Sequence, residues 1–165
     1  MDNKISTGQK ITPFLWFDKN AEEAVNLYTS LFENSVITSK SHYKGESAKA
    51  MNIPDGTVMT VGFKLAGQTF TAINGGPIFK FTEAVSFVVN CETQEEVDKY
   101  WNKLIADGGQ ESRCGWLKDK FGLSWQIVPK QLGELLSNPS KGGKVMQAMM
   151  QMKKIIIADL EKAAQ

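Results

Sequence analysis

The sequence of 165 residues is poor in the side chains that build metal and nucleophilic sites: it has one histidine, His42, and two cysteines, Cys91 and Cys114. A single imidazole excludes any site within one chain that needs two. It also leaves His42 as the only imidazole base for a Ser-His-Asp or Cys-His arrangement. Much of hydrolase and zinc chemistry is thereby excluded.

The sequence also lacks an excess of charge and a long apolar run. Its formal net charge is +1, which gives no electrostatic argument for binding nucleic acid or an anionic membrane. The strongest apolar runs, 14–17 and 85–89, are far shorter than the roughly 20 residues that span a bilayer. Residues 1–10 are polar, without the apolar segment of a secretory signal. A cytoplasmic protein that binds neither nucleic acid nor membrane is expected.

What the sequence does contain is an internal repeat. Residues 14–32 and 87–105 resemble each other when they are aligned with a shift of 73 positions. Each stretch starts with an apolar run and continues with apolar residues at the i, i+3, i+4, i+7 spacing of a helix that packs on one face. The shift pairs Leu31 with Leu104. We interpret the pattern as a duplicated strand–helix unit.

Apolar alternation and turn residues predict the remaining elements. In the first half we expect strands over 36–43, 58–65 and 69–73 and a polar loop over 44–54. In the second half we expect a strand over 84–90, a helix over 94–107, and strands over 112–118 and 124–128. The fold class is α+β: two paired β-α-β-β-β modules, the second shortened by a missing or reduced strand, form a curved mixed sheet with outer helices.

These elements predict one domain over 11–141, with modules at 11–76 and 84–130, after an N-terminal extension of residues 1–10. A C-terminal helix is expected over 142–165, because Val145, Met149, Met152, Ile156 and Leu160 recur at helical spacing. Four of the seven methionines lie in this tail, which gives it a wide, adaptable apolar face. Three roles stay open for that face: packing on its own sheet, a dimer interface, or a surface for a lipid or another apolar ligand.

Several motifs together carry a family resemblance. They are ITPFLWFD at 11–18, NAEEA at 20–24, INGGP at 73–77, CGWLKDKFG at 114–122 and SWQIVP at 124–129. With these motifs the sequence, from residue 11 to about residue 162, resembles the PhnB-like family, often labelled 3-demethylubiquinone-9 3-methyltransferase. This family is a branch of the vicinal-oxygen-chelate superfamily of glyoxalase I, extradiol dioxygenases and bleomycin-resistance proteins. The resemblance implies modules that curve around a cavity, and a homodimer.

The resemblance also implies four positions from which such proteins bind a metal. In this sequence these positions fall near Thr12 or Pro13 and on Phe70, Ser86 and Gln126. Phenylalanine cannot coordinate a metal, proline has no side-chain donor, and serine and glutamine are weak neutral donors compared with imidazole or carboxylate. We therefore expect a protein without a metal or other cofactor.

Strand alternation predicts which side chains face the cavity. The expected ligand-binding residues are Leu15, Phe17, Phe70, Asn74, Ser86, Asn90, Trp116, Ser124 and Gln126. This mostly apolar set, with a few amides and hydroxyls, suits an uncharged or weakly polar organic ligand, such as an aromatic or quinone-like molecule. It contains no evident general base, so no catalytic residue is assigned.

Three functions remain open from the sequence. The leading one is metal-independent binding of a small molecule, as in bleomycin-resistance proteins. The second is an enzyme, either a methyltransferase as the family label says, or a lyase that uses Gln126, Asn74 and water. Against methyl transfer, the glycine pairs at 75–76, 108–109 and 142–143 stand outside any GxGxxG setting. The third is a non-catalytic interaction or regulatory dimer that uses the Met-rich tail.

Overall fold

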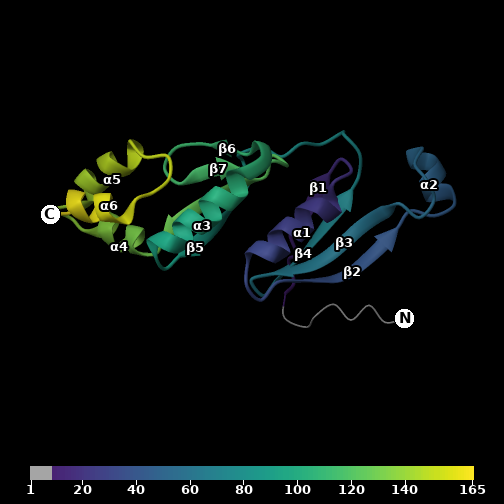
Figure 1. Ribbon diagram of the computed structural model, residues 1–165, viewed down its shortest axis with the longest axis horizontal. Helices are drawn as coiled ribbons and strands as arrows, with labels where there is room; N and C mark the ends of the chain where they lie inside the picture. Colours follow the sequence, from purple (N-terminus) through teal and green to yellow (C-terminus); the bar gives the residue numbers. More distant parts are fainter. Residues whose placement is uncertain (1–8) are drawn as a thin grey trace. The chain divides into compact units, whose positions relative to one another are not determined.

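The computed structural model describes residues 9–165, so that residues 1–8 of the expected N-terminal extension lie outside the described residues. The chain divides into two compact units, Met1–Lys80 and Phe81–Gln165. Each unit holds one four-stranded mixed sheet with helices, which confirms the α+β fold class (Figure 1). Among the described residues, no helix has the length and apolar character needed to cross a bilayer.

The first unit has the predicted β-α-β-β-β order with one added helix. Its elements are β1 (Phe14–Phe17), α1 (Ala21–Leu31), β2 (Val36–His42), α2 (Glu46–Met51), β3 (Val58–Leu65) and β4 (Gln68–Asn74). The sheet order is β1-β4-β3-β2, with β1 and β4 parallel and the other pairs antiparallel. Helix α1 packs against the sheet through Ala24, Val25, Tyr28 and Leu31, all buried.

The short helix α2 corrects the expected polar loop over 44–54. Its sequence, ESAKAM, contains good helix formers but no apolar stripe, so a search for apolar periodicity passes over it. The helix ends where Asn52 adopts the left-handed conformation, with φ of 53°. A salt bridge between Lys49 and Glu46 spans one turn on its exposed side.

The second unit repeats the arrangement with smaller strands. Its elements are β5 (Ser86–Cys91), α3 (Gln94–Ile105), a 3-10 turn (Ala106–Gly108), β6 (Gln110–Glu111), β7 (Trp116–Lys118), β8 (Ser124–Pro129), α4 (Gln131–Ser137), α5 (Gly142–Met150) and α6 (Ile157–Ala163). The sheet order β5-β8-β7-β6 matches that of the first unit, again with one parallel pair. The strand predicted to be reduced is β6, with two residues. The strand expected over 112–118 begins only at Trp116, because the residues before it form the turn from β6.

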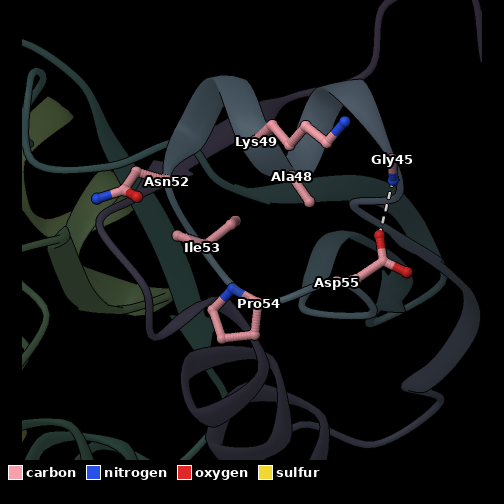
Figure 2. Close-up of a pocket in the computed structure, with 7 residues that line it drawn as sticks. All are labelled: Gly45, Ala48, Lys49, Asn52, Ile53, Pro54 and Asp55. Atoms are coloured by element: carbon pink, nitrogen blue, oxygen red, sulfur yellow. Dashed lines mark hydrogen bonds between the residues drawn. The ribbon is translucent and has the colours of Figure 1, made fainter.

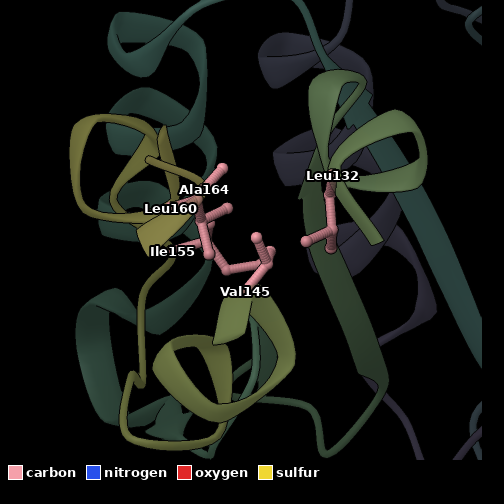
Figure 3. Packing of buried hydrophobic residues seen from close by; sticks show 5 residues of the cluster. All are labelled: Leu132, Val145, Ile155, Leu160 and Ala164. Carbon is pink, nitrogen blue, oxygen red and sulfur yellow. The ribbon is translucent and has the colours of Figure 1, made fainter. Parts of the chain in front are cut away.

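The tail expected as one helix over 142–165 forms two, α5 and α6, separated by residues 151–156. In the segment between them, the carbonyls of Met152 and Lys153 accept hydrogen bonds from the backbone N–H groups of Cys114 and Gly115, both at 2.8 Å. The helical spacing of the apolar residues thus continues across a break. It does so because these residues fill one buried cluster, made of Leu132, Val145, Ile155, Leu160 and Ala164 (Figure 3).

This cluster involves part of the Met-rich tail in packing within its own unit. Met149 and Met152 pack against the cluster, within the second unit, while Met146 and Met150 are exposed. Most of the apolar face of the tail therefore packs within its own unit. For the predicted dimer interface or lipid surface, two exposed methionines of the tail remain available.

The internal repeat exists in the structure, but its shift differs between helix and strand. A shift of 73 aligns the buried helix residues Ala24, Tyr28 and Leu31 with Val97, Trp101 and Leu104. The strands need a shift of 74. The last residue of β1, Phe17, accepts a hydrogen bond from Gly75 N, and the last residue of β5, Cys91, accepts the equivalent bond from Lys130 N. Phe17 therefore corresponds to Cys91, which lies 74 positions later. Residues 18–20 connect β1 to α1, whereas only residues 92–93 connect β5 to α3. A one-residue offset turns every strand side chain to the opposite face of its sheet.

Candidate functional site

The candidate site is the face of the second sheet that does not pack against α3. Trp125 and Ile127 of β8 and Leu117 of β7 are buried on the packed face. The residues that alternate with them lie on the opposite face, which we call the open face. It carries five of the nine predicted ligand-binding residues: Ser86, Asn90, Trp116, Ser124 and Gln126.

A hydrogen-bonded amide and hydroxyl lie at the centre of this open face. Gln126 Nε2 donates to Ser86 Oγ at 2.9 Å, and both residues are half-buried. Trp116 lies directly opposite Gln126 in the antiparallel β7–β8 pair, and Val88 lies opposite it on the parallel side. The bond uses one amide proton, so the Gln126 carbonyl oxygen and the Ser86 proton can still bond to a ligand.

The other four predicted residues lie elsewhere, in the core of the first unit. Leu15, Phe17 and Phe70 are 3–7% exposed on the face that packs against α1. Asn74 is also buried; its Oδ1 accepts from Ala21 N at 2.8 Å and its Nδ2 donates to Val58 O at 3.1 Å. The structure therefore does not bring these four residues to the open face of their sheet. For Leu15 and Phe17 the cause is the different length of the two strand–helix turns, because a shift of 73 pairs them with Val88 and Asn90.

The sequence-based prediction did not include the residues on the corresponding open face of the first sheet. They include Phe14, which is 58% exposed, and the half-buried Trp16 and Thr71. Trp16 Nε1 donates to Gly76 O at 2.9 Å, and its ring lies so close to Gly75 that a Cβ there would be 2.2 Å from it. A count of the residues in each strand–helix turn is the sequence signal that could have found these residues.

The strand shift also changes which residues occupy the expected metal positions. Ser86 and Gln126 correspond by symmetry to Thr12 and Thr71, whereas Phe70 corresponds to the core residue Trp125. All four revised positions carry a neutral hydroxyl or amide. Among residues 9–165 no group of three or more His, Cys, Asp or Glu side chains could hold a metal ion. The donors present do not fit a divalent metal.

The fold likewise does not fit the usual S-adenosylmethionine site. Each sheet contains one parallel strand pair, not the series of alternating parallel strands and helices of an α/β methyltransferase. The turns that follow the opening strands, 18–20 and 92–93, contain no glycine.

The described residues form one hollow beside α2 and another in the second unit. The larger, about 570 Å³, lies beside α2 and is lined by Gly45, Ala48, Lys49, Asn52, Ile53, Pro54 and Asp55 (Figure 2). Most of these side chains are exposed, and the Asp55 carboxylate is already bonded to Gly45 N at 2.7 Å. The smaller, about 140 Å³, is in the second unit and is lined by two predicted residues, Trp116 and Ser124. Of these two hollows, the smaller adjoins the candidate site.

The charged groups beside the smaller hollow are paired. Lys118 Nζ lies 2.5 Å from Glu83 Oε1, and this hydrogen bond lowers the pKa of the Glu83 carboxyl. Glu111 accepts from Lys153 Nζ at 3.1 Å and from Trp101 Nε1 at 3.2 Å; the bond to Lys153 is the main cause of its lowered pKa. Neither of these two carboxyls has the raised pKa of a general acid.

The two thiols differ in their surroundings. Burial raises the pKa of the Cys91 thiol to about 12, with a further contribution from Glu96, so that almost no thiolate forms at neutral or mildly alkaline pH. Cys114 is half-buried in the turn before β7.

We expect a thiol reagent to modify one cysteine in the folded protein and two in denaturant, as mass spectrometry would show. Cys114→Ser should leave none in the folded protein; fast labelling of that variant would contradict the assignment.

Comparison with known proteins identifies the family. The family model described as 3-demethylubiquinone-9 3-methyltransferase matches residues 9–128. A solved structure described as a putative 3-demethylubiquinone-9 3-methyltransferase, PhnB protein, from Bacillus cereus is 42% identical, with a TM-score of 0.65, and the match covers 73% of this chain and 99% of that one. No curated protein matches.

More distant structures share the fold. Protein PA1353 from Pseudomonas aeruginosa is 17% identical with a TM-score of 0.57, over 74% of this chain and 98% of that one. The fosfomycin resistance protein FosX from Listeria monocytogenes is 16% identical with a TM-score of 0.54, over 81% of this chain and all of that one. The chain therefore belongs to the PhnB-like, 3-demethylubiquinone-9 3-methyltransferase family of the glyoxalase and vicinal-oxygen-chelate fold.

Proposed function

We propose that the protein binds a small, uncharged organic molecule, aromatic or quinone-like, without a metal, on the open face of the second sheet. The observation that carries this proposal is the Gln126–Ser86 pair, bonded at 2.9 Å, opposite the indole of Trp116. Such a surface offers one aromatic contact and a few directed hydrogen bonds, the usual chemistry of a site for a small neutral ligand.

Metal independence is supported by the donor chemistry. The four positions that correspond to metal ligands in the fold carry threonine, serine and glutamine side chains, which bind divalent ions weakly. His42, the only imidazole, is exposed on the edge strand β2 of the other unit. The homodimer implied by the family resemblance stays a prediction.

The proposal predicts that phenols or duroquinone raise the melting temperature and bind measurably in calorimetry. Duroquinone suits the test because its fully substituted ring resists addition of thiols. Gln126→Ala should weaken binding about tenfold or more, since it removes a hydrogen bond to the ligand and disorders Ser86. Gln68→Ala, an exposed glutamine on β4, is the matched control and should bind as the wild type does.

Removal of metals should leave this affinity unchanged. The protein as purified is expected to contain no stoichiometric divalent metal by elemental analysis, and after dialysis against EDTA it should bind the same probes equally well. A metal-dependent affinity would refute metal independence. Calorimetric binding of S-adenosylmethionine, followed by methylation of a phenolic probe, would instead favour the methyltransferase that the family description names.

A further inference from the structure

The hydroxyl of Ser124 is a polar group in the second unit without a partner. Ser124 is 1% exposed, and its Oγ makes no hydrogen bond to any residue among 9–165. Buried polar atoms in folded proteins are nearly always hydrogen-bonded, because an unsatisfied one loses its bonds to water and gains nothing in return. Ser124 lines a cavity, but its Oγ has almost no exposed surface, so a group that enters the cavity can satisfy this hydroxyl only when a side chain of the wall moves.

The cavity beside Ser124 is small and polar. Its volume is about 140 Å³, close to the share of liquid occupied by four or five water molecules. Besides Ser124, its walls are Glu83, Gln110, Glu111, Ser112, Trp116, Leu117 and Lys118. A cavity of this size accommodates one end of a small molecule and excludes a large ligand.

The charged side chains in the walls already have partners of opposite sign. Glu83 is paired with Lys118, and Glu111 accepts from Lys153 and Trp101. A charged ligand group would have to break one of these pairs or remain uncompensated, and both are unfavourable. A neutral hydroxyl or carbonyl needs only the Ser124 hydroxyl, which can donate or accept.

We infer that this cavity binds the uncharged hydroxyl or carbonyl end of the proposed ligand, hydrogen-bonded to Ser124 Oγ, while the ligand ring lies against Trp116. The inference rests on the proposed function and narrows it to neutral ligands with a polar end. Lys118 lies opposite Ser124 in the β7–β8 pair, so contact between a ligand and the Ser124 hydroxyl requires the Lys118 side chain to move. The Glu83 side chain is 64% exposed and that of Lys118 32%, so their salt bridge opposes this movement only weakly.

The test compares three probes of similar shape, phenol, toluene and benzoate, by NMR titration of the Trp116 indole N–H. Wild-type protein should prefer phenol about tenfold over both other probes. Ser124→Ala should remove the preference for phenol over toluene. It should also raise the melting temperature of the ligand-free protein, because a methyl group replaces an unsatisfied hydroxyl of similar size.

A matched control separates a binding role from a structural one. The Ser41 hydroxyl is bonded to Thr60 Oγ1 at 2.6 Å, so Ser41→Ala should lower the melting temperature and leave the preference for phenol intact. If Ser124→Ala behaves in the same way, the hydroxyl is structural and the inference is wrong. A water molecule that stays bonded to Ser124 Oγ in a crystal of the phenol complex would also refute it.

The same experiments distinguish this inference from the proposed function. If phenol or duroquinone binds, and Gln126→Ala weakens binding while Ser124→Ala does not, the proposed function stands and the inference fails. If neither compound binds wild-type protein, both are wrong.

Discussion

Asp119→Ala is expected to lower the free energy of unfolding by about 3–5 kcal/mol, because it leaves three donors without an acceptor, two of them in buried bonds and one in a half-buried bond. Asp119 is 3% exposed in the turn between β7 and β8. Its Oδ1 accepts from the backbone N–H groups of Phe121 and Leu123 at 2.9 and 3.0 Å, and its Oδ2 accepts from Trp125 Nε1 at 2.9 Å. This one carboxylate thus holds the turn and fixes the indole that packs beneath β8.

Denaturant titration of the full chain, followed by tryptophan fluorescence, measures this effect. Asp119→Asn should lose less stability than Asp119→Ala. The carbonyl oxygen of asparagine can still accept the two backbone hydrogen bonds of the turn, whereas its NH₂ group cannot accept the bond from Trp125 Nε1. Asp55→Ala removes an exposed carboxylate that bonds one backbone N–H, and should cost less than about 1 kcal/mol. A comparable loss for Asp55→Ala and Asp119→Ala would contradict the assigned role.

Asn74→Ala is expected to lower the free energy of unfolding by about 2–4 kcal/mol, because two buried hydrogen bonds are lost together. Asn20, at the N-cap position of α1, makes no capping bond through its side chain. Asn74 supplies the missing acceptor from β4 by binding Ala21 N, and it ties the same strand to Val58 O. Its amide joins α1, β3 and β4.

The variant Asn74→Asp separates the two bonds. Aspartate keeps the acceptor for Ala21 N and places a negative charge at the N-terminus of α1, which is favourable. It loses the donor to Val58 O. Its denaturation midpoint should therefore lie between those of the wild type and Asn74→Ala. Equal midpoints for Asn74→Asp and Asn74→Ala would show that the contact with α1 contributes nothing.

The sequence was sufficient for the fold class and for most elements, because apolar periodicity reports burial directly. It also placed Ser86, Trp116, Ser124 and Gln126 on one face, since strand alternation in the second half is regular. It failed for Leu15, Phe17, Phe70 and Asn74. The helices of the repeat match at a shift of 73, whereas the extra turn residue in the first half moves the strands to a shift of 74 and reverses the predicted faces of Leu15 and Phe17.

Other features depend on contacts distant in sequence, and no local pattern reports them. The position of Asn74 before two glycines is typical of a turn residue. Its Oδ1 nevertheless accepts a hydrogen bond from Ala21 N, at the start of a helix 53 positions earlier in the chain. The break between α5 and α6 exists because Met152 and Lys153 bond to the turn at Cys114 and Gly115. The unpartnered state of the Ser124 hydroxyl can be recognised only once every neighbour is placed.

The tail has an evolutionary consequence. The family model matches residues 9–128, whereas α4, α5 and α6 follow from Gln131 onward. The connection between α5 and α6 nevertheless bonds to the turn that leads into Trp116, the aromatic side chain of the open face. Substitutions outside the shared region can therefore shift that indole while the sheet stays unchanged. Under the proposed function, ligand preference is therefore expected to respond to substitutions beyond the residues that the family model matches.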